Sequence, residues 1–182
     1  QKEPQKSRSQ AMRVYTDLLN GDEMISDSYK IEKRFNDACF EVKGRLVVKG
    51  AAEVDIGRGN QFGGAGEEEA VEDTSEKVID IVDAFRYTET SFSKADYGTY
   101  IKSYMKKVKA ELEKSNPDRV AGFMAGAKEM FAWVTKQFDD FQFFMGEKCD
   151  PDAHCVLAYY KNDTDEAPTF VYWADGLKGK VF

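Results

Sequence analysis

Apolar and polar positions alternate with a two-residue period in the first part of the chain. The segments MRVYTDLL (residues 12–19) and ACFEVKGRLVVKG (residues 38–50) alternate or cluster β-branched and aromatic side chains, a pattern typical of short strands. Lys43-Gly44 lies inside the second segment and predicts a hairpin turn. The same period returns in EKVIDIVDAFRYTE (residues 76–89), where we expect a further strand.

The period changes to that of a helix between residues 93 and 138. Ser93 is the predicted N-cap of a first helix that ends near Ser115. Asn116 is the predicted cap of a second helix, with Pro117 at its first position. Each helix carries one apolar stripe, made of Tyr97, Ile101, Tyr104, Met105, Val108 and Leu112 in the first and Val120, Phe123, Met124, Ala127, Phe131, Val134 and Phe138 in the second. The two stripes and the short turn predict an antiparallel helical hairpin.

The strand pattern resumes after the helices. FQFFMGE (residues 141–147), HCVLAYYKND (154–163) and PTFVYWADGL (168–177) are expected to form three closing strands. Strands followed by an inserted helical hairpin and more strands predict an α+β protein with a β core. We therefore expect a single domain over residues 12–182. The polar residues 1–11 are expected to be a remnant of expression cloning or a disordered tail.

The stretch GNQFGGAGEEEAVED (residues 59–73) resembles a phosphate loop only in its glycines. Glu67, Glu68 and Glu69 would repel a phosphate, and no Gly-Lys-Ser/Thr ending is present. The alternating oxygen ligands of an EF-hand are also missing. Low hydrophobicity and high charge instead predict a long mobile acidic loop over residues 53–75.

Composition narrows the class of protein further. The chain has 182 residues, of which 42% are hydrophobic, so it can bury one substantial core. Its formal charge of −7 argues against a general nucleic-acid binder. No apolar run approaches the ~20 residues that span a bilayer, so we expect no membrane span.

Charge is distributed unevenly. Residues 53–83 hold ten acidic and two basic side chains, a net charge of −8, whereas residues 94–136 hold nine basic and five acidic ones, a net charge of +4. Lys102, Lys106 and Lys109 follow one edge of the first predicted helix. They form either a solvated helix face or a docking site for an acidic partner such as a polyacidic protein tail.

The cysteines favour a reducing, cytoplasmic location. There are three of them without paired spacing, which is unlike a disulfide framework. A zinc site from Cys149, His154 and Cys155 is not expected, because neighbouring strand residues face opposite sides and structural zinc usually takes four ligands. The single histidine, His154, is interpreted as a strand-edge residue, and the chain is not expected to be an enzyme.

Six segments follow one another in unbroken order along the chain: MRVYTDLLNGDEMISDSY, VIDIVDAF, TSFSKADYGTYIKSYMKK, NPDRVAGFM, FDDFQFFMGE and VYWADGL. Together they resemble the translationally controlled tumour protein family. The resemblance implies a twisted β-tent carrying a helical hairpin and a long mobile acidic loop. This β core resembles small zinc-containing proteins that bind Rab GTPases, although the family lacks their zinc-ligand cysteines.

The resemblance also implies binding activities. Family members are cytoplasmic and growth-associated, bind calcium weakly, associate with tubulin and microtubules through the helical region, and oppose apoptosis through partner proteins. An alternative role is guanine-nucleotide exchange, or chaperoning, on a small GTPase. Glu23 and Glu147 match the family's GTPase-facing carboxylates, but Glu147 could instead pair structurally with a backbone amide or an arginine.

No cofactor is required by this interpretation, but weak calcium binding needs several oxygen ligands. One candidate cluster contains Glu67, Glu68, Glu69, Glu72 and Asp73, and the other contains Asp139, Asp140 and Gln142. Carboxylates without fixed geometry can equally be solvated. The chain ends in Phe182 and not in the cysteine through which animal members form a disulfide dimer, so we expect a monomer.

Overall fold

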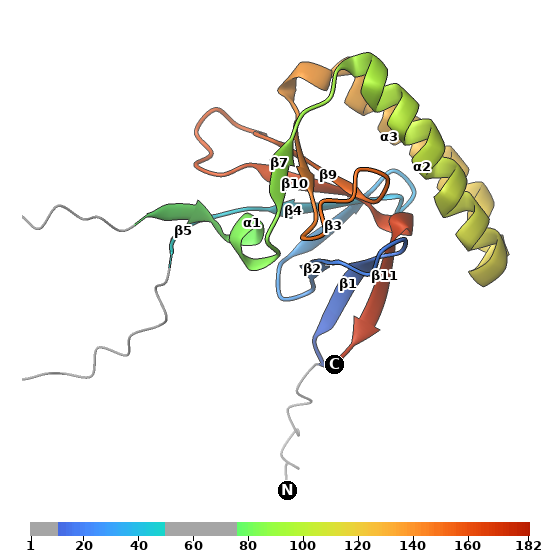
Figure 1. Ribbon diagram of the computed structural model, residues 1–182, viewed down its shortest axis with the longest axis horizontal. Helices are drawn as coiled ribbons and strands as arrows, with labels where there is room; N and C mark the ends of the chain where they lie inside the picture. The colour runs from blue at the N-terminus through green and yellow to red at the C-terminus, as the bar shows by residue number, and fades with distance from the viewer. Residues whose placement is uncertain (1–10, 50–75) are drawn as a thin grey trace, which may run out of the picture.

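The computed structural model describes residues 11–49 and 76–182 (Figure 1). The acidic loop predicted for residues 53–75 therefore lies outside the described residues. The described part is an α+β fold with three antiparallel sheets and a helical hairpin. Both expectations, the fold class and the hairpin, are confirmed.

The largest sheet has six strands. Their order is β3 (Ile31–Arg34), β4 (Cys39–Lys43), β10 (Thr169–Trp173), β9 (Cys155–Tyr159), β8 (Gln142–Met145) and β7 (Thr88–Thr90). Every residue of β10 is buried, because both faces of the sheet are covered. Val171 and Trp173 belong to the core under the helices, whereas Phe170 and Tyr172 belong to a second core on the opposite face.

The second core is closed by a smaller sheet and a short helix. The smaller sheet has the order β11 (Leu177–Val181), β1 (Arg13–Asp17) and β2 (Glu23–Ser26). Met24 and Ile25 of β2 and Ile81 of helix α1 (Asp80–Ala84) are fully buried in this core. The last strand, β11, was not expected, because four of its five residues are exposed and its pattern is weak.

The helical hairpin lies along one side of the six-stranded sheet (Figure 1) and consists of α2 (Lys94–Ser115) and α3 (Val120–Lys136). Ser93 caps α2 as predicted, since its hydroxyl accepts a hydrogen bond from the Asp96 amide at 3.1 Å. Asn116 is the N-cap residue and Pro117 lies in the first turn, as predicted, but this turn is the 3-10 helix Pro117–Arg119 that precedes α3, and the Asn116 side chain makes no cap hydrogen bond. A second 3-10 turn, Phe138–Asp140, leads from α3 into β8.

Two strand predictions are corrected by the pairing. The Lys43-Gly44 pair does not make a hairpin, because the next strand, β5 (Leu46–Val48), pairs with β6 (Lys77–Ile79) and not with β4. The Gly44 amide instead donates to the Pro168 carbonyl, and a Cβ at this position would lie 2.9 Å from that oxygen. The backbone must approach this closely for β4 and β10 to stay paired.

The strand predicted for residues 76–89 is broken by α1. The Asp80 carboxylate accepts hydrogen bonds from the backbone amides of Arg45 and Ile81. These bonds end the β6 ladder and begin a single helical turn, which places Ile81 in the second core. The remaining strand residues, Thr88–Thr90, form β7 at the edge of the large sheet.

Buried polar contacts fasten the hairpin to the sheet. The Tyr100 hydroxyl donates to the Ala153 carbonyl at 2.6 Å and accepts from the Cys155 amide at 2.9 Å. One turn later, the Tyr104 hydroxyl lies 2.7 Å from His154 Nδ1. His154 is therefore not a strand-edge residue: it is 1% exposed, and its amide donates to the buried Asp17 carboxylate. We call Asp17, Tyr100, Tyr104 and His154 the polar latch.

At the far end of the hairpin, Arg119 makes a second attachment. Its Nε and Nη2 donate to the two carboxylate oxygens of Asp175 at 2.8 and 3.0 Å. Nη2 also donates to the Asn36 carbonyl at 2.7 Å. The hairpin is thus held at two places along its length, and its orientation on the sheet is fixed.

Candidate functional site

The outer side of the hairpin carries an apolar groove between α2 and α3. Its cavity volume is about 650 Å³. The lining residues are Ile101, Lys102, Met105, Lys106, Met124, Ala125, Ala127, Lys128 and Phe131. Met124 is 47% exposed although it is a large apolar side chain. An open apolar surface of this kind marks an interaction site on many proteins.

The groove arises because the apolar stripes are wider than the sheet beneath can cover. Phe123 and Met130 of α3 are buried in the core under the hairpin. Met124 lines the groove and is exposed, while Ala127 and Phe131 line the groove and also pack against that core. The apolar residues of both stripes were identified from the sequence. Their division between core and groove depends on how the helices pack, which periodicity alone does not specify.

Lysines border the groove on both helices. Lys102 and Lys106 of α2 lie on one side and Lys128 of α3 on the other. No salt bridge of these three lysines is present within the described residues. Lys109, the third predicted lysine, lies outside the groove lining and pairs with Glu113 at 3.9 Å. Lys128 was missed by the sequence reasoning, although its i+4 spacing from Met124 was the available signal.

Glu23 and Glu147 lie close together on the surface and share one pocket. They line a polar pocket of about 340 Å³ with Ala84, Phe85 and Arg86. Arg86 Nη1 lies 3.0 Å from Glu147 Oε1, and both side chains are largely exposed. Glu147 therefore pairs with an arginine, as the structural interpretation expected, and it also shares a pocket with Glu23.

The loop that carries Glu147 is held rigidly. The Asp22 carboxylate accepts a hydrogen bond from the Lys148 amide at 3.0 Å, and Asp22 is only 6% exposed. A Cβ on Gly146 would lie 2.8 Å from the same carboxylate, so only glycine fits there without a shift. Asp22 was not identified from the sequence, although it lies next to Glu23.

The candidate calcium ligands that the structure describes lie on the exposed surface. Asp139 and Asp140 are exposed in the turn before β8, and Gln142 is the exposed first residue of that strand. Glu67, Glu68 and Glu69 lie outside the described residues. Across residues 11–49 and 76–182, no group of three or more His, Cys, Asp or Glu side chains could hold a metal ion.

The cysteines and the histidine do not form the zinc set. Cys149 is exposed on the turn after β8, whereas Cys155 is buried under the hairpin. Burial raises the pKa of the Cys39 and Cys155 thiols to about 12, so both stay protonated and unreactive at neutral pH. Burial also lowers the pKa of His154 to about 4, although the nearby Asp17 opposes this shift.

The antiparallel sheets with an inserted helical hairpin place the protein in the class of α+β proteins with a β-tent fold. The chain belongs to the translationally controlled tumour protein family, whose family model matches residues 12–178. This confirms the resemblance drawn from the sequence segments. In the described part of the chain, no helix is long and apolar enough to cross a membrane.

Relatives match over nearly their whole length. The chain is 41% identical over 167 residues to a translationally-controlled tumor protein homolog of Mycosarcoma maydis, covering 92% of this chain and 98% of that protein. It is 39% identical over 174 residues to the homolog of Plasmodium chabaudi chabaudi, covering 91% and 97%.

Solved structures of the family share the fold. The translationally controlled tumor-associated protein p23fyp of Schizosaccharomyces pombe superimposes with a TM-score of 0.74 at 37% identity, covering 93% of this chain and 99% of that one. The NMR structure of the protein from Caenorhabditis elegans gives a TM-score of 0.62 at 26% identity, covering 92% and 97%.

Proposed function

We propose that the protein is a cytoplasmic regulatory binding protein whose helical hairpin docks acidic partner proteins, with tubulin and microtubules as the principal example. The observation that carries this proposal is the apolar groove bordered by Lys102, Lys106 and Lys128. Burial of the apolar groove surface by a partner would favour binding by about 25 cal/mol per Å² of apolar area removed from water. The lysines attract an acidic surface and speed its encounter.

Tubulin binding is tested by sedimentation with polymerised microtubules. In the variant Lys102→Glu/Lys106→Glu, two attractive charges become repulsive, so we expect binding to fall at least about tenfold at physiological salt. The matched control is Lys178→Glu/Lys180→Glu, which makes the same charge change on exposed residues of β11. Equal losses in both variants would mean that net charge alone governs binding, and the groove proposal would fail.

A role on a small GTPase, as an exchange factor or a nucleotide-free chaperone, is the second candidate. The proximity of Glu23 and Glu147 around one pocket supports it. A carboxylate can assist exchange by competing for the nucleotide's Mg²⁺ or for the phosphate-binding lysine. The test compares Glu23→Gln and Glu147→Gln with wild type in GTPase binding and nucleotide release. Unchanged binding and release in both variants would exclude this role for the pocket.

Calcium binding and the anti-apoptotic, growth-related partners belong to the same proposal. Calcium would use the carboxylates of residues 67–69 or the Asp139, Asp140 and Gln142 group. We expect weak affinity, because the exposed side chains of Asp139, Asp140 and Gln142 would have to be ordered on binding. An amide-resolved NMR titration with Ca²⁺ and with Mg²⁺ tests this. Saturable shifts in one group with Ca²⁺ alone would support it, and equal linear shifts with both ions would not.

A further inference from the structure

A polar pocket lies at the end of the six-stranded sheet where β3 begins, β4 ends and β10 begins. Its volume is about 420 Å³. The lining residues are Ser28, Tyr29, Lys30, Glu32, Glu41, Lys43, Arg45, Asp80, Lys161 and Thr169. It shares no lining residue with the groove on the hairpin or with the Glu23–Glu147 pocket, and neither proposed role uses it.

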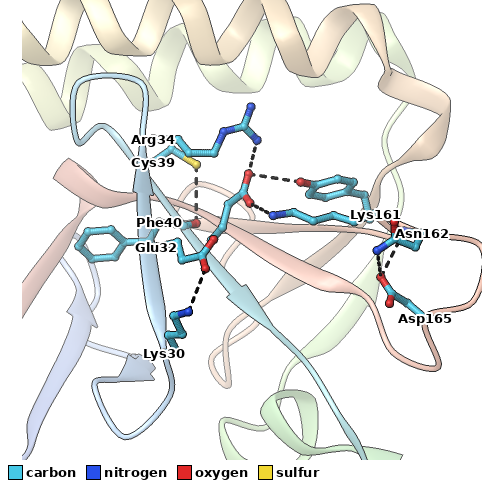
Figure 2. A network of polar contacts seen from close by, with 10 residues as sticks. Lys30, Glu32, Arg34, Cys39, Phe40, Lys161, Asn162 and Asp165 are labelled. Atoms are coloured by element: carbon cyan, nitrogen blue, oxygen red, sulfur yellow. Dashed lines mark hydrogen bonds and ion pairs between the residues drawn. The ribbon is translucent and has the colours of Figure 1, made fainter.

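The most buried charge in this pocket is already compensated. Glu41 is 2% exposed. Its carboxylate is paired with both Arg34 and Lys161, and these two basic side chains are labelled in Figure 2. Arg34 Nη1 bonds Oε1, Lys161 Nζ lies 2.5 Å from Oε2, and the Tyr159 hydroxyl donates to Oε1 at 3.3 Å. Burial alone would raise the pKa of Glu41, but the hydrogen bonds from Lys161 and Arg34 hold it below its usual value.

The other carboxylates of the lining also have partners. Glu32 pairs with Lys30 at 3.5 Å. Asp80 accepts the backbone amides of Arg45 and Ile81, at 2.9 and 2.8 Å. These carboxylates are therefore oriented toward groups of the protein itself, and their repulsion of an entering anion is reduced.

The basic groups are in excess. Among the lining residues, four are positively charged and three negatively charged, namely Lys30, Lys43, Arg45 and Lys161 against Glu32, Glu41 and Asp80. The ion-pair partners outside the lining, Arg34 on Glu41 and Asp165 on Lys43, add one charge of each sign. The balance is +1. The Arg45 side chain has no ion-pair partner within the described residues, although it lines the pocket. As far as residues 11–49 and 76–182 are concerned, the Arg45 guanidinium is available to a ligand.

Hydroxyl groups complete the lining. Tyr29 and the buried Thr169 add hydroxyl groups to the lining, and Ser28 adds a third, whose Oγ lies 2.5 Å from Ser26 Oγ. Lys161 is 40% exposed, so it can turn from Glu41 toward a ligand while Arg34 continues to hold the carboxylate. Several cationic and hydroxyl donors around one volume match a tetrahedral oxyanion, which accepts more hydrogen bonds than a carboxylate does.

We propose that this pocket binds a phosphate monoester group, with Arg45 and Lys161 as its principal ligands and Lys43 and Thr169 beside them. The group is carried either by a small molecule or by a phosphorylated side chain. The doubly charged form is favoured, since the pocket has an excess of basic groups, and binding should weaken below the second phosphate pKa of about 6.

An amide-resolved NMR titration with inorganic phosphate tests the proposal, at ionic strength held constant with chloride. We expect saturable shifts at Ser28, Tyr29 and Arg45. Arg45→Gln and Lys161→Gln should each weaken binding about tenfold, as expected for one charged hydrogen bond. The matched control is Lys33→Gln: Lys33 is opposite Phe40 in the β3–β4 register and so faces the other side of the sheet, and its loss should leave the affinity unchanged.

The same titration with a Gly-phosphoserine-Gly peptide separates the two sources. Tighter binding of the peptide than of phosphate favours a phosphorylated side chain, whereas equal or weaker binding favours a small molecule. The proposal is overturned if the shifts are linear, if chloride alone reproduces them, or if Arg45→Gln binds phosphate as wild type does. Arg45→Gln keeps the test valid if Lys161→Gln is destabilised, because the Arg45 side chain has no ion pair to lose within the described residues.

Discussion

The inner and outer faces of the helical hairpin carry the same kinds of residues but differ in how far the rest of the protein covers them. The inner face buries Tyr97, Phe123 and Val134, and its polar groups belong to the latch on the sheet. The outer face leaves Met124 and its neighbouring lysines open to solvent. Apolar residues on the first face stabilise the fold, whereas on the second they are available to a partner. The difference comes from packing, since both sets lie on the same two helices.

The largest expected difference between the two faces is in the free energy of unfolding, when the adjacent residues Phe123 and Met124 of α3 are each replaced by alanine. Phe123 is 1% exposed, so Phe123→Ala should lower the free energy of unfolding by about 3–5 kcal/mol. Met124→Ala should change it by less than about 0.5 kcal/mol and weaken microtubule binding instead. Urea denaturation of both variants measures the stability, and similar losses in the two would refute the separation of the faces.

Lowering the pH should destabilise the inner face of the hairpin through His154. The pKa of His154 is about 4 in the folded chain and 6.5 as the ordinary value. Between pH 6.5 and about 4, His154 binds a proton in the unfolded chain but stays neutral in the folded protein. The contribution of His154 to the free energy of unfolding is therefore fully present above pH 6.5 and is lost as the pH falls toward 4. A shift of this size corresponds to about 3 kcal/mol.

The comparison of wild type with His154→Asn isolates this contribution, because other titrating groups act in both proteins. Since the chain has one histidine, NMR can also follow its imidazole directly. An imidazole that titrates near its ordinary pKa in the folded protein would show that the latch is open to water.

The attachment at the tip of the hairpin should matter less than the core. Arg119→Gln removes a two-pronged contact with Asp175, whose side chain is 9% exposed, and leaves that carboxylate without its arginine. We expect a loss of about 2 kcal/mol. Arg86→Gln is the matched control, because the Arg86–Glu147 pair is largely exposed and should contribute less than about 1 kcal/mol. Thermal unfolding of the two variants measures the difference, and equal losses would contradict it.

The smallest effect is expected at Lys109. Its pair with Glu113 is exposed at 3.9 Å, so Lys109→Gln should change stability by less than about 0.5 kcal/mol. Because Lys109 lies outside the groove lining, its loss should reduce microtubule sedimentation less than Lys102→Gln does. A larger reduction at Lys109 would move the docking surface along α2, away from the groove.

The parts of the fold that depend on local pattern could be predicted from the sequence. The hairpin and the Ser93 cap follow from helical periodicity and short-range capping. The strands β8, β9 and β10 follow from runs of apolar residues. The pairing partners could not be predicted, since β5 joins β6 and β11 joins β1 through contacts between distant residues.

The candidate site residues also fall into those that local sequence predicts and those that only the packing of distant segments brings together. Lys102 and Lys106 were predicted from spacing along one helix, but Lys128 joins them only through the packing of α3 on α2. His154 looked like a strand-edge residue because its burial depends on Tyr104 of α2, fifty positions earlier. The pocket around Arg45 and Lys161 is lined by residues from five separate segments of the chain. No single sequence motif could therefore predict it.

The most direct test of the docking groove is methyl NMR of the methionines in the presence of unpolymerised tubulin. Met105 and Met124 line the groove, Met24 and Met130 are buried in the two cores, and Met12 is exposed at the start of β1. We predict that the Met105 and Met124 signals broaden on adding tubulin while the Met12 signal does not. Broadening at Met12, or at Met145 beside the Glu147 loop, without change at Met105 and Met124 would contradict the account.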